Sequence, residues 1–336
     1  MSQSYVRPLV QYGVARADDA VSLADGGGWF THVEMLDRDA TPRVMPLSDV
    51  SAQAMVRLTQ SHPMRVQRAR IMGIVNTTPD SFSDGGLHAA AQDAIAGGLA
   101  MSQAGADILD IGGESTRPGA SPVETDEEIS RTAPVIAGLR AQGYAGTISI
   151  DTRKAAVARA ALAAGADLIN DVSGFTHDPE LAGVAAQADV PVCVMHGPVD
   201  PATMHLDPRY DDVVMDVYDF LAQRIAALEA QGIARNRIIA DPGIGFAKTL
   251  EHNLALLQRL SIFHSLGVPI LLGASRKRFI GTIGNVPEAG ARMPGSIAVA
   301  LAGLAQGVQI VRVHDVAETA QAFALWNAIG AGAPEG

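Results

Sequence analysis

Residues 147–171, TISIDTRKAAVARAALAAGADLIND, hold the pattern that decides the fold. Their first apolar run ends in Asp151, and their second ends in Asn170. Between the two runs lies an alanine-rich stretch that closes on Gly165. Alanine is the best helix former, and glycine is favoured just past a helix end. The stretch therefore predicts a strand, a helix and a second strand, with a polar residue directly after each strand.

This unit recurs along the chain. Apolar runs followed by polar residues stand at 71–75, 107–111, 147–150, 167–169, 191–195, 237–240, 268–273 and 308–311. Parallel strands covered on both faces have such near-continuous apolar sequences. An open doubly wound sheet gives similar local signals, but it concentrates its site at one switch point. Polar residues after nearly all strands favour closure, so we predict an α/β fold, a (β/α)8 TIM barrel with its site at the strands' C-terminal ends.

Two regions follow from this periodicity. Residues 1–68 lack it, with turn-rich segments around one strand-like stretch at 29–36, and we expect them to form an N-terminal extension or small subdomain. Residues 69–336 are then the barrel, close to the ~250 residues typical of that fold.

The composition limits the kinds of partner. Hydrophobic residues make up 48% of the 336 residues and aromatic residues 4%, so the core is aliphatic. The formal net charge of −11 argues against a nucleic-acid partner. Apolar segments stay well below the ~18 residues of a membrane span, and the N-terminus has no apolar run typical of a signal peptide. We expect a cytoplasmic protein in which the single cysteine, Cys193, is a core residue.

Two polar loops follow the first two strands. Turn chemistry explains most of 76–86, NTTPDSFSDGG, but it does not explain the aromatic residue Phe82. We interpret this loop as a lid that closes Phe82 over a ligand, and the alternative is an ordinary loop. In 112–119, GGESTRPG, the side chain of Arg117 offers a rigid charged fork for phosphate or carboxylate. The alternative for Arg117 is a solvated side chain in an exposed loop.

Three residues after strands are candidates for binding a flat ring. Asp151 and Asn170 end neighbouring runs, and Asp241 ends a third. A carboxylate accepts hydrogen bonds from ring N–H and amino groups, whereas an amide accepts one and donates another. Each residue alone has a second interpretation, as the N-cap of the following helix.

Two basic groups follow the last two strands. Residues 275–278, SRKR, are the only dense basic cluster, and they stand at a predicted helix start, where anions bind. Arg312 and His314 are two apart on a strand, so both side chains point the same way. We interpret both groups as anion sites. The alternatives are a solvated turn for the first and an ion pair with an acid such as Asp315 for the second.

The chain as a whole resembles the dihydropteroate synthase family. The resemblance spans nearly all of 71–325 and rests on motifs at 76–86, 112–119, 149–152, 169–174, 241–246, 275–277 and 312–316. It implies a (β/α)8 barrel, usually a homodimer. It also implies that the enzyme joins 6-hydroxymethyl-7,8-dihydropterin diphosphate to p-aminobenzoate in folate synthesis. Sulfonamides mimic the aminobenzoate, and both substrates are small molecules.

The resemblance also implies roles for single residues. The implied pterin-binding residues are Asp151, Asn170, Met195, Asp241, Phe246 and Lys277. The implied diphosphate-binding residues are Asn76, Arg117, Arg312 and His314, with Mg²⁺ at Asn76. The implied aminobenzoate-binding residues are Phe82, Thr116, Pro118, Lys277 and Arg278. The implied catalytic residues are Asp84, Thr116, Arg117, Lys277, Arg312 and His314.

The sequence departs from the family in two places. Arg278 stands where the family commonly has Ser, and Gly197 begins a segment that in the family often reads Met-Gln-Gly.

Two other functions share parts of the pattern. A barrel that passes a methyl group from a folate to a corrinoid protein has no use for a diphosphate site. A non-catalytic pterin-binding paralogue would have lost catalytic positions, and none of the expected ones is lost here.

Overall fold

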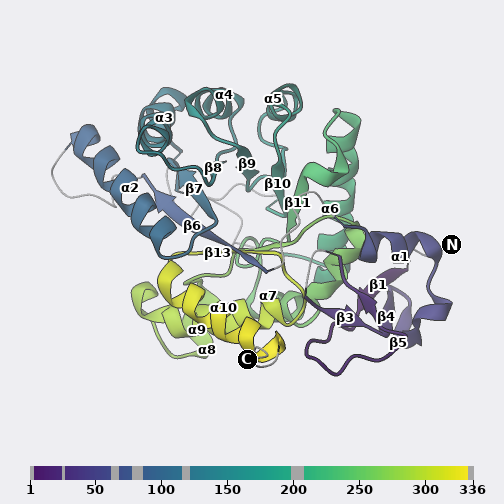
Figure 1. Cartoon of the computed structure of the whole chain (residues 1–336). Helices are drawn as coiled ribbons and strands as arrows, with labels where there is room; N and C mark the ends of the chain where they lie inside the picture. Colours follow the sequence, from purple (N-terminus) through teal and green to yellow (C-terminus); the bar gives the residue numbers. More distant parts are fainter. Residues whose placement is uncertain are drawn as a thin grey trace.

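Eight parallel strands form the centre of the computed structural model, which describes residues 4–24, 27–61, 68–77, 86–115, 122–197 and 208–331 (Figure 1). The strands are β6 (Arg70–Asn76), β7 (Ile108–Gly112), β8 (Thr147–Asp151), β9 (Leu168–Asp171), β10 (Val192–Met195), β11 (Ile238–Asp241), β12 (Leu271–Leu272) and β13 (Ile310–Val313). The hydrogen-bonded order is β11-β10-β9-β8-β7-β6-β13-β12. Each neighbour in this order is also the next strand along the chain, apart from the pair β13 and β6, which joins the last strand to the first.

The remaining pair, β11 and β12, closes the ring. A parallel bridge joins Ala240 to Ile270, and the backbone N–H of Ala240 donates to the carbonyl of Pro269 at 2.9 Å. The prediction of a (β/α)8 barrel is therefore confirmed, with all eight strands at the predicted runs. The last strand, predicted at 308–311, lies two residues further along the chain, so that it contains Arg312 and Val313.

Helices connect the strands and lie outside the ring (Figure 1). They are α2 (Gly86–Gln103), α3 (Thr125–Ala141), α4 (Ala155–Ala164), α5 (Leu181–Ala188), α6 (Val213–Ala230), α7 (Leu250–Gln258), the 3-10 helix η4 (Leu260–Leu266), α8 (Arg278–Ile283), α9 (Met293–Leu304) and α10 (Val316–Ala331). Gly165 shows how they end: at φ +111° its N–H bonds to the last turn of α4, a conformation that glycine adopts without strain. None of the described helices combines the length and hydropathy needed to span a membrane.

The inside of the barrel is filled rather than open. Its apolar layer consists of buried side chains from every strand except β8, namely Met72, Ile108, Leu168, Cys193, Ile239, Leu271 and Ile310. Strand β8 contributes Ser149, which is fully buried as well. Since the apolar layer closes the barrel centre, ligands can enter only from the ends of the strands. Cys193 is a core residue, as expected.

In the described part of the chain before the barrel, the residues form two small antiparallel sheets, a short 3-10 helix, η1 (Leu47–Asp49), and one α-helix. One sheet has the order β1 (Tyr5–Pro8), β4 (His32–Asp37), β5 (Ala40–Pro46), and the other pairs β2 (Val21–Ser22) with β3 (Trp29–Phe30). With α1 (Ala52–Thr59) they enclose a separate core around Phe30, Val33 and Leu58. The one stretch predicted as a strand, 29–36, is divided in the structure between β3 and β4, which belong to different sheets. Strand β5 was not predicted, since it is almost wholly exposed and so shows no apolar alternation.

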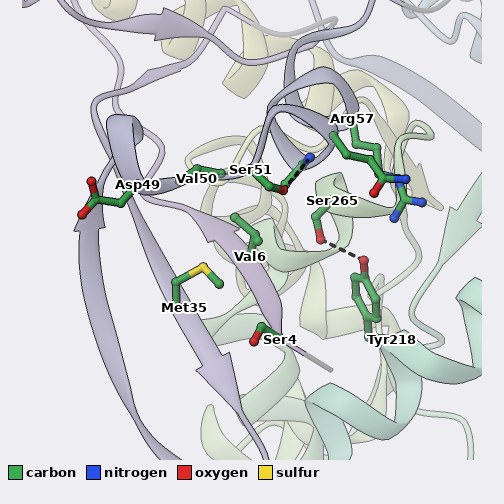
Figure 2. Close-up of a pocket in the computed structure, with 11 residues that line it drawn as sticks. Ser4, Val6, Met35, Asp49, Val50, Ser51, Arg57, Tyr218 and Ser265 are labelled. Atoms are coloured by element: carbon green, nitrogen blue, oxygen red, sulfur yellow. Dashed lines mark hydrogen bonds between the residues drawn. The ribbon is translucent and has the colours of Figure 1, made fainter. Parts of the chain in front are cut away.

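This N-terminal subdomain, residues 4–61, packs on the outside of the barrel beside α6 and η4 (Figure 1). Arg38 forms ion pairs with Asp216 and Asp219 of α6, both at 2.7 Å. A pocket of about 370 Å³ lies in the contact region (Figure 2). Tyr218 and Ser265 of the barrel line it, and the hydroxyl of Ser265 donates to that of Tyr218 at 3.0 Å. This pocket shares no residue with the candidate site described next.

Candidate functional site

The predicted ring-binding residues meet at one end of the barrel. Asp151 ends β8 and lies opposite Asn170 of β9, while Asp241 ends β11 opposite Met195 of β10. Asn170, Met195 and Asp241 are buried, and Asp151 is nearly so. The helices that follow begin at other N-caps, Lys154, Glu180 and Thr249. The three polar residues are therefore not helix caps, and their polar atoms form a layer at the strand ends.

Arg312 crosses this layer from the opposite wall. Its Nε donates to Asp110 at 2.6 Å and its Nη2 donates to Asp151 at 2.8 Å. Asp110 also accepts from the amide Nδ2 of Asn170 at 3.1 Å. Arg312 does not pair with Asp315, which accepts instead from Arg276. Arg312 therefore does form an ion pair with acids in the barrel, the alternative interpretation, but its partners are Asp110 and Asp151 of neighbouring strands and not Asp315.

Asp110 is a site residue that the sequence analysis missed. It stands inside the apolar run of β7 and is fully buried. The sequence did not show whether this carboxylate points into the barrel or toward the helices. A parallel strand is covered on both faces, so the residues on its two faces look alike in sequence. The signal that could have found it is the pairing rule for buried charges, which demands a cation within the same barrel.

Lys277 reaches the layer from the loop after β12. Its Nζ lies 4.4 Å from the ring centroid of Phe246 and donates to the carbonyl of Ile244. Asp241, whose oxygen accepts from the backbone N–H of Gly243 at 2.7 Å, is close enough for its charge to act on the ammonium. Phe246, Asp241 and Lys277 therefore form one side of the layer, with an aromatic face and a cation together.

The other residues of the cluster at 275–278 have different surroundings. Ser275 is 3.0 Å from Nδ1 of His314, and Arg276 is bound by Asp315. Arg278 is exposed as the first residue of α8, a helix of six residues. The structure thus divides the predicted anion cluster, and of its cations only Lys277 lies at the polar layer.

Small residues leave room above the layer. Gly112 ends β7 between Asn76 and Asp151, and an added Cβ there would lie 3.7 Å from the Asp151 side chain. Gly273 follows β12, where an added Cβ would lie 3.4 Å from a carboxylate oxygen of Asp241. Asn76 is exposed at the end of β6. The glycines keep the space beside both carboxylates open, so a flat molecule can reach them.

Burial shifts the titration of these groups. Burial raises the pKa of Asp151 to about 7, with Arg312 opposing the shift and Asp110 adding to it. Burial also raises the pKa of Asp241, against the opposing charge of Lys277. The pKa of Lys277 is lowered to about 8 by burial, although Asp241 counteracts this. Perturbed acids and bases gathered at one strand end are typical of a functional site.

A second buried pair supports the loop after β11. Nζ of Lys248 lies 2.9 Å from Nδ1 of His196 and donates to the carbonyl of Phe246 at 2.9 Å. Burial lowers the pKa of Lys248 well below its usual range, and burial with the Lys248 charge lowers the pKa of His196 to about 2. A neutral imidazole accepting from the lysine anchors the loop that carries Phe246.

Several predicted residues cannot be located. Phe82, Asp84, Thr116, Arg117 and Pro118 lie outside the described residues. Within the described ranges, no three His, Cys, Asp or Glu side chains are grouped as a metal site.

Comparisons with known proteins agree with this geometry. The family described as "Pterin binding enzyme" matches residues 72–314. Dihydropteroate synthase of Escherichia coli K12 is 44% identical over 271 residues, which cover 81% of this chain and 93% of the relative. The structure of Xanthomonas albilineans dihydropteroate synthase with 4-aminobenzoic acid is 48% identical, with a TM-score of 0.75 over 79% of this chain and 94% of that one. The same enzyme with 7,8-dihydropteroate is 44% identical, with a TM-score of 0.71 over 79% of this chain and 95% of that one.

Fold, polar layer and family match together define a pterin-binding enzyme built on a (β/α)8 barrel. The relatives agree over most of the barrel in sequence and in structure. The chain belongs to the dihydropteroate synthase family, whose members are transferases of folate biosynthesis.

Proposed function

We propose that the polar layer at the barrel mouth binds the pterin ring and the diphosphate of 6-hydroxymethyl-7,8-dihydropterin diphosphate. The enzyme joins this substrate to p-aminobenzoate and releases 7,8-dihydropteroate and diphosphate. The observation that carries the proposal is the meeting of Asp151, Asn170 and Asp241 with Lys277 and Arg312 at one end of a filled barrel. These groups suit a flat ring with hydrogen-bond donors that bears an anionic leaving group.

The ring is held by hydrogen bonds to the two carboxylates and the amide. Asp151 and Asp241 accept from N–H and amino groups, and Asn170 adds an amide between them. The ring of Phe246 and the thioether of Met195 supply apolar surface for its flat face. Asp151 accepts from Arg312 in this structure, so ring binding exchanges one hydrogen-bond donor for another.

The leaving group is held by cations. The carbon–oxygen bond to diphosphate breaks with its electron pair on the diphosphate, and the amine lone pair of aminobenzoate forms the new carbon–nitrogen bond. The amine then loses a proton to solvent or to the departing diphosphate. Arg312 and His314, with Arg117 and Asn76, stabilise the charge that develops on the diphosphate. Asp84 and Thr116 complete the catalytic set from the first two loops.

Magnesium fits this arrangement as an ion carried by the substrate. Mg²⁺ prefers oxygen ligands and is usually bound by one or two protein groups together with phosphates and waters. Asn76, an exposed residue at the end of β6, has an amide oxygen of this kind. When bound, the ion neutralises charge on the diphosphate.

Aminobenzoate lies above the ring, against Phe82, Thr116 and Pro118, with Lys277 at its edge. Arg278, exposed at the start of α8, supplies a guanidinium for its carboxylate.

The active protein is a homodimer of this chain, and residues 1–68 and 69–336 are its two domains.

A thermal-shift titration tests this function against the two alternatives. Pterin diphosphate should raise the melting temperature, with a larger rise in Mg²⁺ and a further rise with aminobenzoate. A methyl-transferring barrel would respond to the pterin without any effect of diphosphate or Mg²⁺. A non-catalytic paralogue would bind the same ligands without forming dihydropteroate.

A further inference from the structure

We propose that Asp110 is a positioning residue for this reaction. One oxygen of its carboxylate sets the orientation of the Asn170 amide and holds the guanidinium of Arg312. It thereby aligns a group that binds the ring with a group that binds the diphosphate. The inference rests on the function proposed above and adds to it a residue that touches neither substrate.

The position of Asp110 places it directly beneath the polar layer. It lies opposite Ile74 of β6 and Ser149 of β8, two residues before Gly112 at the strand end. Its side chain is fully buried, whereas 10% of the Asp151 side chain is exposed. Ligands at the strand ends therefore meet Asp151, and Asp110 acts through its neighbours.

The contact with Asn170 decides which atom of the amide faces the mouth. Oδ2 of Asp110 lies 3.1 Å from the amide nitrogen of Asn170 and accepts its hydrogen bond. A carboxylate only accepts, so the nitrogen end of the amide must turn toward Asp110. The carbonyl oxygen of Asn170 is then the atom left to accept from a ring N–H. Asp110 thus selects a ring with a donor at that place.

The contact with Arg312 joins the same oxygen to the anion site. Oδ2 accepts from Nε of Arg312 at 2.6 Å, while Asp151 binds the other end of the guanidinium. When Asp151 turns to the ring, the bond to the wholly buried Asp110 keeps the guanidinium in place. Taking away one partner of a buried ion pair leaves the other unpaired, so this bond is the more costly one to break.

Two variants separate the hydrogen-bond acceptor from the charge. Asp110→Ala removes both, and Asp110→Asn keeps an oxygen that can accept from Asn170. Ser149→Ala is the matched control, because Ser149 is equally buried beside Asp110 on β8. Calorimetry with 6-hydroxymethylpterin, which lacks diphosphate, measures ring binding alone. Steady-state kinetics with both substrates measures kcat and KM.

We expect Asp110→Ala to weaken 6-hydroxymethylpterin binding by roughly tenfold or more, the cost of a mispaired buried group. Asp110→Asn should bind this probe within about threefold of wild type yet lose roughly tenfold in kcat, because Arg312 loses its ion pair with Asp110. Ser149→Ala should match wild type in both. If Asp110 had a purely structural role, its variants would be less stable, but Asp110→Asn would not combine near-normal binding of 6-hydroxymethylpterin with a reduced kcat.

Asn170→Ala distinguishes a failure of this inference from a failure of the proposed function. Unchanged pterin affinity in Asn170→Ala would overturn the proposed function. Weakened affinity in Asn170→Ala with normal affinity and kcat in Asp110→Asn and Asp110→Ala would overturn only the role of Asp110. If Asp110→Ala does not fold, Asn170→Asp replaces it. Asn170→Asp sets two carboxylates together and should weaken pterin binding, and adding Asp110→Asn should restore that affinity. If the losses of affinity in the two single variants instead multiply in the double variant, the inference is contradicted.

Discussion

At the scale of single residues, Asp151 and Lys277, two of the perturbed groups of the polar layer, define a pH range for the reaction. Burial raises the pKa of Asp151 to about 7, so the fraction of its ionised form, the form proposed to accept hydrogen bonds from the ring, grows as the pH rises through 7. Burial lowers the pKa of Lys277 to about 8, so its positive charge is lost above that pH. The value of kcat/KM for pterin diphosphate should therefore peak between these two pKa values, since it reports the free enzyme.

The variant Asp151→Asn tests which group causes the acid limb. It should weaken pterin binding by ~1–3 kcal/mol, because the amide presents a donor to a ring donor. The remaining activity should no longer fall as the pH drops through 7. An acid limb that persists unchanged in Asp151→Asn would assign the titration to another group.

Arg278 gives a second test at this scale. Arg278 is exposed as the first residue of α8, where we propose that its guanidinium binds the carboxylate of aminobenzoate. In Arg278→Ser the KM for aminobenzoate should rise severalfold and depend less on salt, with the KM for pterin diphosphate unchanged. Aminobenzoate kinetics identical to wild type across a salt series would place Arg278 outside the site.

Residues also show where sequence reasoning stops. Asp151, Asn170 and Asp241 could be found because each ends an apolar run, and the strand ends of a parallel barrel converge. Asp110 could not be found, since its direction depends on the register between β7 and its neighbours. The cluster at 275–278 looked uniform in sequence. Its side chains separate in the structure because Arg276 has φ +59°, which turns the backbone between Ser275 and Lys277.

At the scale of elements, the segment from β11 to α7 must fit closely against β10 to hold Asp241 and Phe246. Gly243 has φ +68°, and a Cβ there would overlap the backbone carbonyl of His196. Gly243→Ala should therefore lower both stability and pterin affinity, because the backbone must shift. Differential scanning calorimetry and a pterin titration measure the two effects.

Gly183 in α5 is the matched control for that variant. It is exposed within a helix, and a Cβ there would meet nothing within 4 Å. Gly183→Ala should raise stability by ~0.5–1 kcal/mol with no change in pterin affinity. If Gly243→Ala and Gly183→Ala changed stability and pterin affinity equally, the close approach of Gly243 to His196 would not matter for either.

Elements were predictable where their sequence pattern was strong. The eight barrel strands were found, since burial on both faces gives long apolar runs. Strand β1 was missed because it has four residues and ends in Pro8, and β5 because most of it is exposed. Short or exposed strands owe their existence to partners elsewhere in the chain, which local sequence does not reveal.

At the scale of the whole molecule, the N-terminal subdomain has its own core and touches the barrel away from the polar layer. Phe30, fully buried at the centre of that core, is a large side chain whose removal leaves a cavity. Phe30→Ala should cost ~3–5 kcal/mol in the stability of the subdomain, measured by urea unfolding, and leave kcat and both KM values unchanged. Val44→Ala, at a side chain 64% exposed on β5, should change neither.

A fall of kcat in Phe30→Ala under conditions where the protein stays folded would show that the subdomain acts on the reaction. Its contacts with α6, such as those between Arg38 and Asp216, would then be the place to look for the coupling.

The central claim is that this barrel mouth makes dihydropteroate, and product formation tests it most directly. The full chain is incubated with pterin diphosphate, p-aminobenzoate and Mg²⁺, and 7,8-dihydropteroate and diphosphate are quantified together. We predict the two products in equal amounts, and a loss of roughly 10²-fold or more in turnover for Arg312→Ala, the scale of one lost transition-state contact. No product from the wild-type chain, or near-normal turnover in Arg312→Ala, would contradict the account.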